Sequence, residues 1–335
     1  MQLSKYPRVK LIHSPTPLEH LENLTKKLGG PEIYIKRDDC TGLAFGGNKS
    51  RKLEFLIGDA LDKNADVVIT AGAVQSNHCR QTAAAATKFG LECIIVARPS
   101  WSKDYNGNIF LDELLGAKLV LLDEDGEALD KGGRLSMDDT IENIIQDLKD
   151  KGKNPYFIPV GGSNHIGSLG YISMTMEMVS QANDMGIEIG SMVAASGSGG
   201  TQTGMILGAD VEKSGINAVG MGISSDASVV IPKLKDLIKE YATMGGVVSR
   251  PAFSNLDMGF RTQKTPKDTD LSGMVEDIYG QSTQKVNVKE FMGEVSNFNS
   301  FGNEIYREGN LRELAERLSK LAMTAKQHTL QETED

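Results

Sequence analysis

Residues 66–98 read DVVITAGAVQSNHCRQTAAAATKFGLECIIVAR and contain two apolar runs separated by a helical pattern. The runs at 66–72 and 92–98 are rich in β-branched residues and lack polar alternation, which predicts strands buried on both faces. The alanine-rich stretch between them repeats its apolar residues at helical spacing. A strand, a helix and a second strand in this order predict a right-handed crossover within a parallel sheet.

The same alternation extends over most of the chain. Further apolar runs, each followed by a segment of helical character, lie at 33–37, 118–123, 156–161, 191–197 and 217–223. We therefore expect an α/β fold of two open, mostly parallel twisted sheets, with helices on both faces.

The sequence changes character beyond about residue 250. Residues 251–273 are polar and turn-rich, with no convincing strand. The chain then becomes helical, and an intramolecular packing face is expected along one side of its last helix, at Leu311, Leu314, Leu318 and Leu321. We expect 251–335 to be an atypical, largely helical segment.

Composition and charge exclude several classes of protein. The 36 basic and 45 acidic residues give a net charge of −9, which argues against a nucleic-acid partner. The three cysteines, Cys40, Cys79 and Cys93, are too few and odd in number for a disulfide framework and indicate a reducing compartment. No signal-peptide core and no run of about 18 apolar residues is present, so we expect a soluble, cytoplasmic protein without membrane contact.

Glycines are concentrated where a ligand would bind. Of the 36 glycines, 30 precede residue 251, and many lie in turns that follow predicted strands. These turns are AGAVQSN at 71–77, GGSNHIGSLGY at 161–171 and SGSGGTQTG at 196–204. In open α/β sheets ligands bind at the carboxyl ends of the strands, so the turns predict a ligand site.

Lys49 follows two glycines in GGNKSRK at 46–52, at the expected start of a helix. The glycines open the backbone to a planar ligand, and the helix N-terminus lowers the pKa of an ammonium group there. A neutral lysine is what Schiff-base chemistry requires. Taken by itself, the motif fits an ordinary surface lysine better.

The loop at 196–204 predicts an anion site, since backbone N–H groups and a helix N-terminus suit a phosphate. It lacks the GK[ST] ending of a triphosphate-binding loop and a convincing acidic partner for a dinucleotide. The alternative is a merely tight turn.

The polar cluster QSNHCRQ at 75–81 begins another expected helix, where Ser76 or Asn77 could simply cap the N-terminus. His78 and Cys79 suggest a base and a nucleophile, but adjacent helical residues point about 100° apart. This geometry disfavours a thiol protease or a metal site, and we expect no metal.

In this order, GGNKSRKLEF, QSNHCRQTAAAA and SGSGGTQTG together resemble the fold-type II pyridoxal-phosphate enzymes, which are tryptophan-synthase-β-like. The similarity is to the branch with D-cysteine desulfhydrase, L-cysteate sulfo-lyase and 1-aminocyclopropane-1-carboxylate deaminase. SPTPLEHL at 14–21, KRDDCTGLAFGG at 36–47, NGN at 106–108 and IPVGGSN at 158–164 support it. The resemblance covers about residues 5–245.

The resemblance implies a domain organisation and an assembly. Residues 1–50 and 165–250 would form a large cofactor-binding domain, and residues 51–164 a small α/β domain. Family members suggest a homodimer.

The resemblance also implies roles for individual residues. Lys49 would hold pyridoxal 5′-phosphate covalently and, once freed by the substrate, act as general base at the α-carbon. Asn77 would hydrogen-bond the cofactor's 3-hydroxyl, and Ser76 with Gln75 or His78 would meet the substrate carboxylate or assist proton transfer. The other cofactor-binding candidates are Asn48, Ser196, Gly197, Ser198, Gly199, Gly200 and Thr201, and the other substrate-binding candidates are Gly161 and Ser163.

The implied reaction eliminates a sulfur leaving group from D-cysteine or L-cysteate to give pyruvate and ammonia. Ring opening of 1-aminocyclopropane-1-carboxylate and a catalytically impaired, protein-binding descendant are the alternatives. A sulfonate would need an additional cationic contact, for which Arg80, Arg98 and His165 are candidates, although each also fits a structural role.

The C-terminal part departs from the family. Tyr279 and Tyr306 are candidates for two catalytic tyrosines, although the residues around them predict helix and not strand. Arg307 would then face the pyridine nitrogen and leave the ring unprotonated, as a poorer electron sink.

Overall fold

The computed structural model describes residues 3–99, 106–123, 125–130, 133–222, 227–244 and 257–260. The chain divides into two compact units, and the first, 1–102 with 108–269, holds nearly all of these residues. The second unit, 103–107 with 270–335, lies outside the described residues except for Asn106 and Gly107. The predictions for the helical C-terminal segment therefore also lie outside them.

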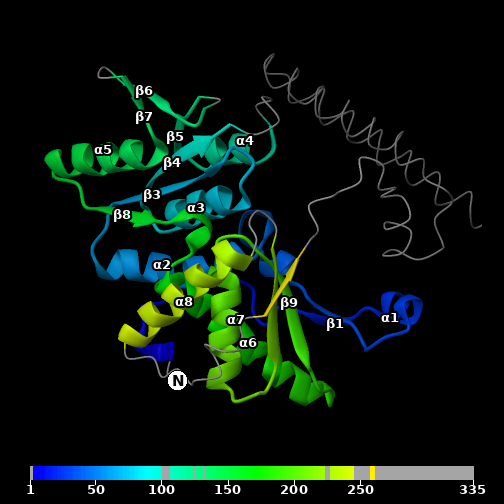
Figure 1. The fold of residues 1–335 in the computed structure, drawn as a ribbon. Coiled ribbons are helices and arrows are strands. Elements are labelled where there is room, and N and C mark those ends of the chain that lie inside the picture. Colours follow the sequence, from blue (N-terminus) through cyan, green and yellow to red (C-terminus); the bar gives the residue numbers. More distant parts are fainter. Residues whose placement is uncertain are drawn as a thin grey trace, which may run out of the picture. The chain divides into compact units, whose positions relative to one another are not determined.

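One parallel sheet has the strand order β5-β4-β3-β8. Its strands are β3 (Val67–Ala73), β4 (Glu92–Arg98), β5 (Lys118–Leu121) and β8 (Pro155–Ile158). Its helices are α3 (Asn77–Lys88), α4 (Gly107–Leu114) and α5 (Met137–Asp150). Figure 1 shows α5 and α3 on opposite sides of the sheet. The central strands β3 and β4 are buried on both faces, as their uninterrupted apolar runs predict.

A second parallel sheet has the order β11-β10-β9. It consists of β9 (Ser191–Ser196), β10 (Asn217–Gly222) and β11 (Asp257–Phe260), with helices α6 (His165–Met185), α7 (Gly200–Val211) and α8 (Ala227–Thr243). The core beside it joins Leu169, Ile172 and Leu207 with Ile238. Together the two sheets confirm the predicted α/β class. The division into a large and a small domain stays a prediction.

Three details of the sequence-based expectation are wrong. Residues 257–260 form a strand parallel to β10 although their sequence, DMGF, has no β-branched residue. The run at 33–37 does not join a parallel sheet, because β2 (Tyr34–Lys36) pairs antiparallel with β1 (Leu18–His20). In β9 burial alternates, and Val193 is 64% exposed, so this strand is not covered on both faces.

The remaining described elements are short. Helix α1 (Glu22–Leu28) connects β1 to β2, and β6 (Ala128–Asp130) pairs antiparallel with β7 (Gly133–Leu135). Four 3₁₀ helices complete the described chain: η1 (Leu3–Lys5), η2 (Asp38–Thr41), η3 (Leu43–Phe45) and η4 (Val160–Gly162).

Helix α2 (Lys49–Asp62) is buried at every position from Ser50 to Ala60. It packs against α6 so closely that a Cβ on Gly170 would lie 2.3 Å from the backbone oxygen of Arg51. Glycine is therefore required at 170, and the two helices fix each other at the end of α2 that carries Lys49.

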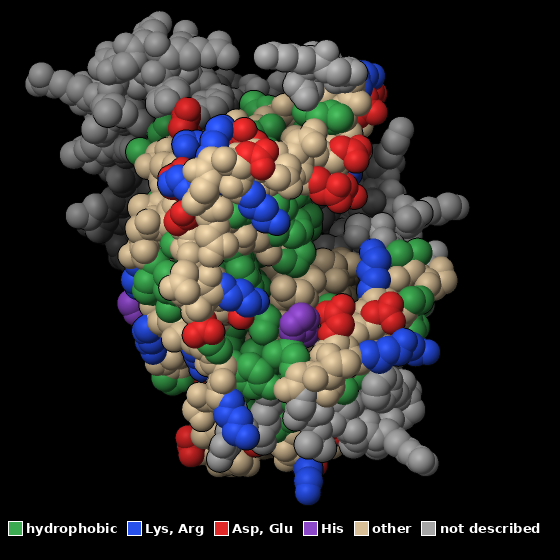
Figure 2. Space-filling model, turned by 90° about the vertical axis from the view of Figure 1, so that its left-hand side faces the viewer, with side chains coloured by type: hydrophobic (Ala, Val, Ile, Leu, Met, Phe, Trp, Pro, Cys, Tyr) green, Lys and Arg blue, Asp and Glu red, His purple; other side chains and the backbone are tan. Residues whose placement is uncertain are grey.

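Charges of both signs are mixed on the described surface. In Figure 2, Lys and Arg side chains of the described residues are interspersed with Asp and Glu on the face shown.

All three cysteines are free, with Cys40 exposed and the other two buried. No helix in the described parts of the chain is long and apolar enough to cross a bilayer.

Candidate active site

A tightly folded loop leads into Lys49, the first residue of α2. Ala44 and Phe45 have positive φ values of 44° and 68°, a conformation that is costly for residues with a side chain. Gly46, at φ 74°, fits because a Cβ there would lie 1.9 Å from the backbone oxygen of Asp39. Thr41 Oγ1 donates to the oxygen of Gly47 and accepts from its N–H. The backbone before Lys49 is thus held in one conformation.

The Lys49 side chain is held by amides. Its Nζ donates to Asn48 Oδ1 at 2.9 Å, and Asn77 Nδ2 reaches the same oxygen at 3.4 Å. Burial lowers the pKa of Lys49 to about 8. The ammonium therefore loses its proton far more readily than that of a surface lysine, because it has been taken out of water without a carboxylate partner.

This lowered pKa predicts the reactivity of the free amine. In the cofactor-free protein we expect Lys49 to be acylated by an amine reagent with a midpoint near pH 8, since only the neutral amine reacts. Peptide mass spectrometry across a pH series measures this midpoint, with the exposed Lys63, which follows the last residue of α2, as the comparison. A Lys49 midpoint equal to that of Lys63 would contradict the expectation.

The glycine loop connects the end of β9 to the start of α7. Strand β9 ends at Ser196, Gly199 adopts a left-handed φ of 86°, and α7 begins at Gly200. The first N–H groups of a helix have no partner within it, and they carry the positive end of its dipole. This geometry suits the predicted phosphate loop, which stays a prediction, and Ser196 turns its hydroxyl to Gln202 Oε1 at 2.8 Å.

The loop after β8 lies against the glycine loop. Ser163 Oγ and Ser198 Oγ are 2.6 Å apart, and a Cβ on Gly200 would lie 2.9 Å from Ser163 Cα. A Cβ on Gly161 would lie 2.8 Å from Ser198 Oγ and 3.6 Å from Lys49 Cε. The structure thus brings Lys49, Gly161, Ser163 and the glycine loop together, with glycine where a side chain would fill the space between them.

Lys52 is a member of this site that the sequence-based reasoning missed. Its Nζ donates to the oxygen of Gly161 at 3.0 Å and to Ser163 Oγ at 3.2 Å. Burial, with the nearby charge of Lys49 adding to it, holds the pKa of Lys52 well below its usual value. The signal in the sequence is its spacing of three residues from Lys49, which places both lysines on one side of a helix.

The cluster at 75–81 has mixed roles. Ser76 caps the N-terminus of α3, as the sequence allowed, because its hydroxyl oxygen accepts a hydrogen bond from the N–H of Cys79 at 3.4 Å. Asn108 holds Gln75 through two hydrogen bonds. The backbone N–H of Asn108 donates to Gln75 Oε1, and its side-chain amide donates to the backbone oxygen of Gln75. Gln81, which was not predicted, accepts from both the N–H and the hydroxyl of Ser50 at 2.7 Å and so ties α3 to α2.

His78 does not fit its predicted role as a substrate ligand or proton carrier. The residue is 2% exposed, and its Nε2 is hydrogen-bonded to Thr70 Oγ1 at 2.8 Å. Burial lowers the pKa of His78 to about 3, so the ring is neutral in the core. Burial likewise raises the pKa of Cys79 to about 12, which leaves that thiol protonated and unreactive.

The candidate cations for a sulfonate are engaged elsewhere or exposed. Arg80 donates to the oxygen of Gly46 at 2.9 Å and to Asn108 Oδ1 at 2.6 Å, which braces the loop before Lys49. His165 pairs with Glu240 at 3.0 Å, and Arg98 is exposed at the end of β4. Tyr279, Tyr306 and Arg307 lie outside the described residues.

Comparisons with known proteins agree with this geometry. A family model described as "Pyridoxal-phosphate dependent enzyme" matches residues 9–257. A Pyrococcus horikoshii protein named "Putative 1-aminocyclopropane-1-carboxylate deaminase" is 44% identical over 73% of this chain and 71% of its own. The D-cysteine desulfhydrase of Yersinia enterocolitica is 41% identical over 75% of this chain and 74% of its own. A crystal structure titled as an ACC deaminase homologue superposes with a TM-score of 0.71 at 37% identity, covering 92% of this chain and 90% of that one.

Proposed function

Because the chain belongs to the family of pyridoxal-phosphate-dependent enzymes, we propose that it is a lyase that eliminates sulfide from D-cysteine to give pyruvate and ammonia. The observation that carries the proposal is the pairing of a buried lysine, whose pKa is lowered to about 8, with a glycine-lined anion site. The sequence identity with D-cysteine desulfhydrases supports the choice of substrate.

The residues fit the cofactor. Glycines at 161 and 200 leave free the space that a Cβ would fill beside Ser198 and Ser163. The start of α7 offers N–H donors for a phosphate, and Lys52 adds a buried amine beside the same loop. An amine for covalent attachment and donors for the phosphate are the two things that a pyridoxal-phosphate site must supply.

We assign the residues as follows. Lys49 would hold the cofactor covalently, while Asn48 and Asn77 would orient it through their side-chain amides. The 5′-phosphate would be bound by N–H groups of the loop from Gly197 to Thr201, by the Ser198 hydroxyl and by Lys52. When bound, the pyridine ring supplies an electron sink that stabilises negative charge at the substrate α-carbon.

The chain's own groups would then move the protons. A neutral Lys49 amine can take the α-proton, since its pKa of about 8 lies near physiological pH, where a general base is most effective. Ser76 and Gln75 lie at the end of β3, where the substrate carboxylate could accept hydrogen bonds. The two hydrogen bonds from Asn108 already fix the position of Gln75 for binding this carboxylate.

Ring opening of 1-aminocyclopropane-1-carboxylate is the second candidate, because the Pyrococcus relatives and the solved homologue carry that name. Both reactions would use the same cofactor with the amine of Lys49 as the base, so the described residues serve either. The homodimer and the cytoplasmic location remain proposals that rest on the family resemblance.

A product assay with D-cysteine, L-cysteate and 1-aminocyclopropane-1-carboxylate side by side tests the proposal. We expect pyruvate and sulfide from D-cysteine, with kcat/KM at least about tenfold above that for the other two, a difference of about 1.4 kcal/mol in the barrier. 2-Oxobutyrate from the cyclopropane amino acid as the main product would favour the second candidate. Cofactor uptake without any keto-acid product would favour an impaired descendant.

A further inference from the structure

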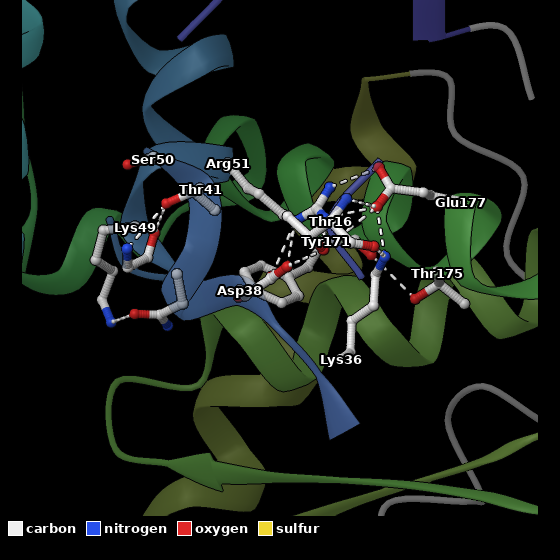
Figure 3. Close-up of polar contacts among 12 residues, drawn as sticks. Thr16, Lys36, Asp38, Thr41, Lys49, Ser50, Arg51, Tyr171, Thr175 and Glu177 are labelled. Atoms are coloured by element: carbon white, nitrogen blue, oxygen red, sulfur yellow. Dashed lines mark hydrogen bonds and ion pairs between the residues drawn. The ribbon is translucent and has the colours of Figure 1, made fainter. Parts of the chain in front are cut away.

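A cluster of four buried or half-buried charges lies next to Lys49 in the fold. It consists of Lys36 from β2, Asp38 from η2, Arg51 from α2 and Glu177 from α6, and we call it the ion cluster (Figure 3). Two cations and two anions balance within it. The cluster joins three segments that are far apart in the sequence, and one of them is the first turn of α2.

Arg51 is the centre of the ion cluster. Its side chain is 1% exposed. Nε donates to both carboxylate oxygens of Asp38, at 3.0 and 2.9 Å, and the terminal nitrogens donate to both oxygens of Glu177, at 3.2 and 2.9 Å. This use of the planar guanidinium on two carboxylates fixes orientation in a way that a lysine cannot. Arg51 is two residues from Lys49, so it fixes the turn that carries that amine.

Each charged group of the ion cluster forms an ion pair with a group of opposite charge in the cluster. Lys36 Nζ donates to Glu177, to Gln181 Oε1 and to the oxygen of Thr16. Burial works to raise the pKa of Glu177, but hydrogen bonds from Arg51 and Lys36 outweigh it and lower the pKa to about 2. The Glu177 carboxylate therefore stays ionised at neutral pH, between the two cations.

Tyr171 connects the ion cluster to the site. Its hydroxyl donates to Asp38 Oδ2 at 2.9 Å. The Asn48 side chain also acts on this hydroxyl, since it works against the rise in the pKa of Tyr171 that burial causes. Asn48 in turn accepts from Lys49 Nζ and Asn77. Hydrogen bonds thus join Lys49 to Asn48 on one side and Tyr171 to Asp38 and Arg51 on the other, and Asn48 lies near enough to Tyr171 to affect its hydroxyl.

We propose that Arg51 and Tyr171 are positioning residues: through the ion cluster they hold Asn48 and Lys49 in place before the cofactor binds. This inference rests on the proposed function of Lys49. It assigns work to a group of residues that would not touch cofactor or substrate themselves.

The ion cluster acts on Lys49 by position and not by its charge. Burial is the cause of the lowered pKa of Lys49. A cluster with zero net charge produces little field at a distance. If the cluster loosens, Lys49 gains water, and its pKa rises toward that of an ordinary lysine.

The chain offers control variants whose partners, Glu54 and Asp59, lie further along α2. Tyr156 donates to Asp59 at 2.6 Å, as Tyr171 donates to Asp38. Arg8 pairs with the buried Glu54 through Nε at 2.8 Å, as Arg51 pairs with its carboxylates. The variants Tyr171→Phe and Arg51→Lys can therefore be compared with Tyr156→Phe and Arg8→Lys.

Two readouts are needed: the dissociation constant of pyridoxal 5′-phosphate, from titration of the cofactor-free protein, and the pH midpoint of Lys49 acylation without cofactor. We expect the dissociation constant to rise about fivefold in Tyr171→Phe and at least about tenfold in Arg51→Lys. In both we expect the Lys49 midpoint to move upward from pH 8. The control variants should keep the dissociation constant within about twofold of the wild type and the Lys49 midpoint within about 0.3 pH unit, which is the same factor in the acid constant.

Equal effects of a site variant and its control, or an unmoved Lys49 midpoint in Tyr171→Phe and Arg51→Lys, would overturn the positioning role. If Arg51→Lys does not fold, Tyr171→Phe, which loses one hydroxyl, decides the matter alone. Failure of the wild-type protein to bind the cofactor would refute the proposed function, and the acylation midpoints would still test the positioning of Lys49.

Discussion

Lys49→Ala is expected to lower kcat by at least about 10⁴-fold, equivalent to about 5.5 kcal/mol of transition-state stabilisation. The proposed mechanism uses this amine twice, first to bind the cofactor covalently and then as the base at the α-carbon. Removing both roles affects the chemical step more than substrate binding. Steady-state kinetics with D-cysteine measure the loss, which should fall on kcat more than on KM.

A second measurement separates loss of chemistry from loss of the fold. Borohydride reduction of the cofactor-loaded wild type should attach the cofactor to the peptide that contains Lys49, and the alanine variant should show no attachment there. Lys63→Ala is the matched control, since Lys63 is an exposed lysine at the far end of α2, paired with Asp59 at 2.7 Å. Attachment at another lysine, or kcat within about tenfold of the wild type in Lys49→Ala, would refute the assignment.

The parts of the fold that follow from local pattern were predictable. The runs at 66–72 and 92–98 became β3 and β4, because the five consecutive uncharged residues at 67–71 and at 93–97 can be buried on both faces only in a central strand. The strand at 257–260 was missed for the opposite reason, since its backbone pairs with β10 without help from β-branched side chains.

Some residues of the site could likewise be predicted from the local sequence, and others could not. Lys49 and the glycine loop carry motifs within a few residues, so their chemistry could be inferred from the sequence. The ion cluster could not, because Glu177 meets Arg51 across 126 positions and no local pattern marks either residue. The role predicted for His78 does not fit, because its side chain points into the core and is hydrogen-bonded to Thr70. The direction of this side chain follows from the packing of α3 and not from the local sequence.

Lys52→Met should weaken binding of pyridoxal 5′-phosphate about 100-fold, or by about 2.7 kcal/mol, while leaving binding of pyridoxal, which has no phosphate, almost unchanged. Lys52 Nζ lies against Ser163 Oγ and the oxygen of Gly161, beside the glycine loop. The amine therefore faces the expected phosphate and not the ring. Titration of the cofactor-free protein with each ligand gives the two dissociation constants.

The same substitution has a predictable effect on stability, with a sign set by the lowered pKa. In the unfolded chain the Lys52 amine has a pKa of 10.5, and in the folded protein burial holds it well below. At pH values below 10.5 the unfolded chain therefore binds the proton more tightly, which disfavours the cofactor-free folded state.

Lys52→Met removes that cost without opening a cavity, so we expect the cofactor-free variant to be more stable than the wild type near pH 7, with the difference shrinking as pH approaches 10.5. Urea unfolding at several pH values measures it, and Lys63→Met, at an exposed position, should show no such trend. A cofactor-free variant that is less stable, or equal loss of both ligands, would mean that Lys52 supports the fold and not the phosphate. The expected combination, a more stable protein that binds the phosphorylated ligand poorly, would show that Lys52 is kept for binding at the expense of stability.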